Sequence, residues 1–93
     1  MSRLIARKGD GSSHGATIFF TNQDGTVFCE GKEVAVEGAK LYSHYSEPVH
    51  ETPEIHGNLA SKLFINGKKV VLDDSIADCG AVIEAGSTKT YGE

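Results

Sequence analysis

Five histidine and cysteine side chains outside the expected strands are of the types that bind transition metals at neutral pH. They are four histidines and one cysteine, all in segments expected to be loops: His14, His44, His50, His56 and Cys79. Zinc in proteins takes four nitrogen or sulfur ligands arranged as a tetrahedron. A set of four protein ligands is structural, and its binding energy then contributes directly to folding. These residues therefore offer ligands for one structural zinc ion.

The spacing of the candidates does not specify a site on its own, because intervals of 29, 5, 5 and 22 residues fit no standard zinc finger. An internal repeat indicates which of these residues lie at equivalent positions. The stretch "HGATI" at 14–18 returns as "CGAVI" at 79–83, with cysteine in place of histidine. Three loops end in a potential ligand: "GDGSSH" at His14, "GAKLYSH" at His44 and "DSIADC" at Cys79. Three such units around a common axis would bring these ligands to one end, where one more histidine completes the site.

The elements that must position these loops are β-hairpins. Residues 25–36, "GTVFCEGKEVAV", align without a gap on residues 61–72, "SKLFINGKKVVL". In each copy, apolar β-formers flank a two-residue turn, Glu30-Gly31 or Asn66-Gly67, and Asn-Gly is a preferred pair for a type I′ turn. The third unit ends early, in "AGSTKTYGE", and is expected to keep only the first strand of its hairpin.

Each hairpin presents one apolar face to the interior. With two-residue turns, the positions on that face are Leu63, Ile65, Val70 and Leu72 in one copy and Val27, Cys29, Val34 and Val36 in the other. Cys29 thus occupies the place of an inward isoleucine, and we interpret it as a core residue. A disulfide with Cys79 is not expected, because thiols stay reduced at a cytosolic site of synthesis.

The composition favours an all-β fold with a thin core. Eleven glycines and many short, turn-bounded apolar segments leave little room for helix, and 93 residues without tryptophan bury few large side chains. Residues 44–58 are expected to form one long irregular surface loop. Gly9, Gly11 and Gly15 are expected to let the backbone turn sharply around His14.

The charge and hydropathy of the chain exclude several classes of function. A net charge of −4 argues against non-specific binding to nucleic acid or to anionic membranes. No apolar run is long enough to span a bilayer. The apolar stretch near the start is too short for a signal peptide, so synthesis in the cytoplasm is expected.

These motifs resemble the PAAR-repeat family, the conical proteins at the spike tips of type VI secretion systems and contractile phage tails. The resemblance rests on "ARKGDGSSHGATI", the hairpins "VFCEGKEV" and "LFINGKKV", "IHG" at 55–57 and "DCGAVIEAGS". It implies a single PAAR-like domain over residues 1–93 without N- or C-terminal extension domains. The implied fold is a small all-β, conical, pseudo-threefold domain of hairpin repeats with a metal site near the tip.

The resemblance also implies one structural Zn²⁺ bound by three histidines and one cysteine. Carried over by motif, the ligands are His14, His44, His56 and Cys79, with His50 as the alternative fourth ligand. The chain departs from the family pattern in several places. The namesake Pro-Ala-Ala-Arg is degenerate, as 33–36 and 69–72 read "EVAV" and "KVVL", and Gly-Asp is kept only at 9–10.

The function implied by the resemblance is structural rather than enzymatic. One monomer would bind the blunt end of a trimeric β-helical spike, either VgrG-like or a phage central spike, and would sharpen and seal it for membrane piercing. Attachment of effector proteins is a further option. The protein would meet the target membrane only transiently, would bind no nucleic acid, and would be delivered outside the cell or into a target cell.

Two other functions are compatible with the residues. A zinc hydrolase would keep an open coordination position and use Glu51 or Glu54 as general base, although no HExxH-type helix is present. A metal-free β-domain that binds a protein or a glycan would need none of the histidines. Analysis of bound metal separates these alternatives.

Overall fold

The computed structural model describes residues 3–13, 15–23, 27–42, 53–87 and 91–92. In this part of the chain every regular element is a short strand, so the all-β prediction is confirmed. No helix able to cross a membrane occurs among these residues. The strands are β1 (Arg3–Leu4), β2 (Gly11–Ser12), β3 (Ile18–Phe20), β4 (Phe28–Cys29), β5 (Lys32–Glu33), β6 (Lys40–Leu41), β7 (Ile55–Gly57), β8 (Phe64–Ile65), β9 (Lys68–Lys69), β10 (Ile76–Ala77), β11 (Ile83–Glu84) and β12 (Tyr91–Gly92).

The two predicted hairpins form as expected. Strand β4 pairs antiparallel with β5, and β8 pairs with β9, in the same register relative to their turns. The turn residues Glu30 and Gly31 have φ of 52° and 83°, and Asn66 and Gly67 have φ of 53° and 81°. Two successive positive φ values define the type I′ turn, whose twist matches that of the strands.

A third, discontinuous hairpin closes the set. As expected, the third unit contributes the first strand of this hairpin, β12. Strand β12 pairs antiparallel with β1, so the second strand comes from the N-terminal segment. Tyr91 opposes Leu4 as Phe28 opposes Glu33 and Phe64 opposes Lys69. The two ends of the described chain therefore build one hairpin equivalent to the two continuous ones.

Three further strand pairs join the repeats into a closed ring. Strand β3 pairs with β6, β7 pairs with β10, and β11 pairs with β2. In each case the strand that follows the loop of one unit pairs with the strand that precedes the loop of the next, and the third unit returns to the first. This cyclic pairing is the structural form of the pseudo-threefold repeat that the sequence predicts.

The centre of the ring is a cycle of backbone hydrogen bonds. The amide of Ala6 donates to the carbonyl of Val71 (3.0 Å), the amide of Val71 to Ala35 (2.9 Å), and the amide of Ala35 to Ala6 (3.1 Å). All three residues have 0% exposure. Equivalent residues of the three units thus meet on one axis, where small side chains allow the backbones to approach.

Two clusters of buried side chains lie along this axis. The first, at the strand ring, includes the equivalent isoleucines Ile18, Ile55 and Ile83. The second, under the hairpins, consists of Ile5, Cys29, Val34, Val36, Ala60, Val70 and Leu72, with Leu63 and Ile65 packed against it. The inward face predicted for the hairpins is confirmed for Cys29, which is 5% exposed, whereas Val27 is 37% exposed.

Two sequence-based predictions about the backbone are wrong. Residues 44–58 are not irregular throughout, because Ile55–Gly57 form β7 and pair with β10. Nearby prolines and charged residues favoured a loop here. Burial of Ile55 and the pairing of β7 with β10 stabilise a strand instead. Gly9 and Gly15 have positive φ, 92° and 84°, but Gly11 lies in the extended strand β2 and supplies no turn.

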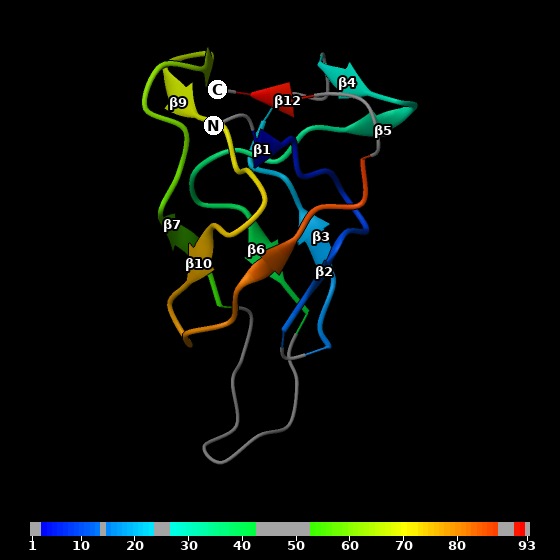
Figure 1. Cartoon of the computed structure of the whole chain (residues 1–93), viewed down its shortest axis with the longest axis vertical. Helices are drawn as coiled ribbons and strands as arrows, with labels where there is room; N and C mark the ends of the chain where they lie inside the picture. The colour runs from blue at the N-terminus through cyan, green and yellow to red at the C-terminus, as the bar shows by residue number, and fades with distance from the viewer. Residues whose placement is uncertain (1–2, 14, 24–26, 43–52, 88–90, 93) are drawn as a thin grey trace.

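Figure 1 shows how these layers are stacked. The three hairpins lie at one end of the molecule, together with both chain ends, and we call this the hairpin end. The turns that follow β2 and β10 lie at the opposite end, which we call the loop end. The strand ring is between them.

Candidate metal centre

The turns at the loop end place two of the predicted ligand positions in equivalent surroundings. The amide of Gly15 donates to the carbonyl of Ser12, and the amide of Gly80 donates to the carbonyl of Ala77, both at 2.9 Å. Both glycines have positive φ, 84° and 88°. Positions 14 and 79 precede these glycines, so the repeat alignment of the two turns is confirmed. His14 itself lies outside the described residues.

Cys79 is the predicted ligand whose surroundings are best defined. It forms no disulfide, and the residue is partly buried against the ring cluster of the core. The neighbouring amide of Asp78 donates to the carbonyl of Glu54 (2.8 Å), which attaches this turn to the segment preceding β7. The turn is thus fixed on both sides of Cys79, as a metal ligand requires.

His56 lies on a strand rather than in the predicted loop. Ile55 pairs with Ala77 and Gly57 with Ile76, so His56 is the extra residue of a β-bulge. Its side chain is 45% exposed, and its Nε2 is 2.9 Å from Oε1 of Glu54. Glu54 also forms an ion pair with Lys40, with an N–O distance of 3.8 Å.

The strand register separates His56 from the turn of Cys79. Strands β7 and β10 are antiparallel, and Ile55 lies opposite Ala77. From Ala77, strand β10 continues toward the loop end and reaches Cys79. From Ile55, strand β7 continues in the opposite direction, so His56 lies farther from the loop end. Within the described ranges, no group of three or more His, Cys, Asp or Glu side chains could hold a metal ion. The predicted ligands His44 and His50, and the alternative base Glu51, lie outside the described residues.

The buried isoleucine of each unit gives a common reference point for the ligands. His14 precedes Ile18 by four residues, and Cys79 precedes Ile83 by four. In the middle unit the equivalent isoleucine is Ile55, which His50 precedes by five residues, while His56 follows it.

Sequence reasoning missed the third copy of the axial segment. Residues 5–7, "IAR", are equivalent to "VAV" at 34–36 and "VVL" at 70–72, as their antiparallel bridges show. Here Arg7 is buried, and its Nη2 lies 3.2 Å from Oδ1 of Asp10. The stretch "IARKGD" at 5–10 could have revealed this third copy, because it keeps the Ala-Arg and Gly-Asp pairs of the family motif.

An apolar cavity opens at the hairpin end. Its volume is about 350 Å³, and its lining includes Ile5, Val34 and Val70, which precede the three axial residues in their units. The rest of the lining comes from the two continuous hairpins. The third hairpin has Gly92 at the position of Cys29 and Ile65, and so adds no side chain there. The cavity therefore lies at the centre of the hairpin end.

Comparison with known proteins agrees with this architecture. A model of the PAAR motif family matches residues 8–85 of the 93-residue chain. No curated protein matches the chain. The family match covers all three loops and both continuous hairpins. The chain therefore belongs to the PAAR motif family of spike-tip proteins.

Proposed function

We propose that this protein caps the blunt end of a trimeric spike in a secretion system or phage tail, one chain to each trimer. The hairpin end rests on the spike, and the loop end points outward. The family membership supports a spike-tip role, and the closed ring supports the stoichiometry. A homotrimer has a threefold end, and a single chain matches it by offering three similar edges.

The observation that carries this proposal is the cycle of hydrogen bonds among Ala6, Val71 and Ala35. If the three similar segments were only stacked in a row, each would present a different surface to a partner. The cycle relates the segments by an approximate rotation about one axis, so each hairpin meets the outside in the same way. This is the symmetry that a trimeric partner requires.

We propose one zinc ion at the loop end, held by His14, His44 and Cys79 with His50 as fourth ligand. The equivalent turns before Gly15 and Gly80 support the first and last ligands. His56 was carried over by motif, but its place on β7 and its contact with Glu54 favour His50 instead. When bound, zinc supplies crosslinks between the three loops.

The described residues around the proposed site fit a structural metal ion. Beyond the ring cluster, the described turns at the loop end carry small or polar residues, among them Ser13, Gly15, Asp78 and Gly80. These residues cannot by themselves form a hydrophobic core. The partly buried thiol of Cys79 in a fixed turn is suited to a structural site. Such a protein performs no reaction and acts by its shape.

The test of the proposed function is the composition of the complex with a trimeric spike protein from the same source organism. Native mass spectrometry is expected to detect one copy of this chain per spike trimer, even with the chain in excess. Three copies per trimer would contradict the threefold match. Absence of any complex would contradict the spike-tip role of this chain.

A further inference from the structure

Among the described residues, the exposed cations gather at the hairpins. Lys32, Lys62, Lys68 and Lys69 lie in the two continuous hairpins or directly beside β8, and Lys8 donates its amide to the carbonyl of Glu33 at the end of β5. The exposed carboxylates are Glu30 in the first hairpin, Asp74 in the segment after Leu72, and Asp78 and Glu84 in the strand ring and loop end. The described strands and turns of the two continuous hairpins thus expose more cations than carboxylates.

One cation recurs at the same position of all three hairpins. Lys32 pairs with Cys29, Lys68 pairs with Ile65, and Arg3 pairs with Gly92 at the equivalent step. Lys68 donates to the carbonyl of Asn22, and Arg3 donates to carbonyls after β7 and β9. Carbonyl oxygens are neutral acceptors, so each hairpin keeps its positive charge.

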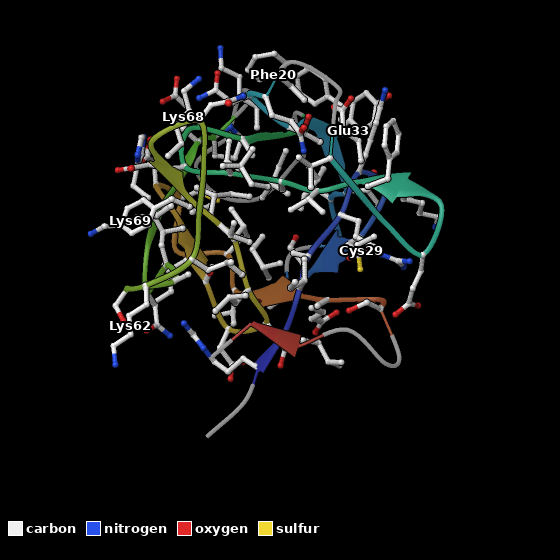
Figure 2. The ribbon with its side chains drawn as sticks, turned by 90° about the horizontal axis from the view of Figure 1, so that it is seen from above. Phe20, Cys29, Glu33, Lys62, Lys68 and Lys69 are labelled. Carbon is white, nitrogen blue, oxygen red and sulfur yellow. The ribbon has the colours of Figure 1, made fainter. Side chains whose placement is uncertain are left out.

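The distribution around the axis is uneven. Figure 2, which looks onto the hairpin end, shows Lys62, Lys68 and Lys69 along one side of the molecule and Glu33 on the other. Glu33 and Lys69 are equivalent residues of their hairpins, opposite Phe28 and Phe64. The hairpin β8–β9 thus carries the strongest positive charge.

The centre of the same end is apolar. Phe28 and Phe64, at equivalent positions, are 59% and 49% exposed. Both contribute to the cavity of about 350 Å³ that Ile5, Val34 and Val70 line from below. Exposed aromatic residues around an apolar depression, within a charged rim, have the arrangement of a protein interface.

We propose that the hairpin end is a docking surface for a trimeric protein whose end has an apolar centre and a rim of carboxylates. The apolar centre of the partner enters the axial cavity between Phe28 and Phe64, and its carboxylates face the cations of the three hairpins. Complementary charge also steers the approach of the partner to the hairpin end. This inference rests on the proposed function and specifies the chemistry of the partner's end.

A protein fits this surface better than a nucleic acid or an anionic membrane. Polyanions need a continuous basic surface, whereas here the basic rim encloses an apolar depression and is interrupted by Glu30 and Glu33. The aromatic residues are arranged about an axis that a nucleic acid does not have.

The test is the affinity of the chain for the trimeric spike protein, measured by biolayer interferometry at two salt concentrations. The variant Lys62→Glu/Lys69→Glu is expected to bind at least about tenfold more weakly in about 50 mM salt, with the difference shrinking at about 500 mM. Lys40→Glu, a charge reversal on the strand ring, is the matched control and is expected to change affinity less than about threefold.

The apolar centre is tested by a second matched pair. Phe64→Ser removes an exposed aromatic side chain of the hairpin end and is expected to weaken binding at least about tenfold. Ile76→Ser removes a 41% exposed apolar side chain of the ring and is expected to leave affinity unchanged. Circular dichroism confirms that each variant is folded.

The outcomes separate this inference from the proposed function. Tight, salt-independent binding that is insensitive to Lys62→Glu/Lys69→Glu overturns the charge complementarity and leaves the spike-tip function standing. Wild-type binding to phosphatidylserine vesicles, lost in the lysine variant while spike binding persists, assigns the hairpin end to lipid and also overturns it. Failure of the wild type to bind the spike contradicts both.

Discussion

Replacing Cys79 with serine is expected to remove zinc from the protein and to lower its melting temperature by roughly 12 °C or more. Structural zinc sites contribute apparent binding energies of roughly 10–16 kcal/mol at neutral pH. Losing even about 3 kcal/mol of this in a domain of this size shifts the melting temperature by roughly 12–24 °C. Mass spectrometry of metal content and a thermal unfolding scan measure the two effects on the same sample.

The histidines near the middle unit provide the controls for this result. His50→Ala is expected to lose zinc as Cys79→Ser does, because His50 precedes Ile55 by five residues, close to the four by which His14 and Cys79 precede Ile18 and Ile83. His56→Ala is expected to retain one zinc per chain, since His56 lies in the β7 bulge and contacts Glu54. Loss of zinc in His56→Ala alone would assign the fourth ligand to His56. A wild-type protein without metal would contradict the zinc site and favour a metal-free binding module.

Replacing Asp10 with serine is expected to destabilise the fold by up to about 3–5 kcal/mol, because it leaves the buried guanidinium of Arg7 with only the longer ion pair to Glu30, at 3.8 Å. The side chains of Arg7 and Asp10 are 7% and 2% exposed, and Oδ2 of Asp10 also accepts the backbone amide of Arg7 at 2.8 Å. A β-carbon added at Gly86 would lie 2.8 Å from Oδ1 of Asp10, so the pair is tightly enclosed. Chemical denaturation measures the loss.

The third repeat supplies the control for this prediction. There Leu72 and Ser75 stand in place of Arg7 and Asp10, and Oγ of Ser75 accepts the amide of Leu72 at 3.0 Å. The double variant Arg7→Leu/Asp10→Ser copies this arrangement and is expected to return within about 1.5 kcal/mol of the wild type. A double variant as unstable as Asp10→Ser would show that the loss comes from the other contacts of the Asp10 carboxylate rather than from the weakened pairing of Arg7.

The local features of the fold were predictable from the sequence where short-range rules decide them. Asn66-Gly67 adopts the expected turn because asparagine and glycine tolerate positive φ, and Glu30-Gly31 adopts the same turn at the aligned position of the repeat. Cys29 is buried because alternation in a hairpin fixes which residues face inward. The equivalence of the turns before Gly15 and Gly80 also follows from the repeat.

Features that depend on distant parts of the chain were not predictable in this way. The pairing of β1 with β12 joins the two ends of the described chain, and no local pattern indicates it. Strand β7 forms next to Pro53 because Ile55 fills the same buried place as Ile18 and Ile83. The pair of Arg7 and Asp10 is enclosed by Gly86, which is distant in the sequence and packs against both side chains. The ligand histidines His14, His44 and His50 lie outside the described residues, and their assignment stays a prediction.

The central claim, that the hairpin end rests on the spike and the loop end points away, is tested most directly by photo-crosslinking. Benzoylphenylalanine would be placed at Phe64, which is 49% exposed at the hairpin end, and separately at Tyr42, which is 57% exposed where β6 leads toward the loop end. We predict crosslinks to the spike trimer from position 64 and none from position 42. Crosslinks from position 42 with none from position 64 would reverse the orientation and contradict the account.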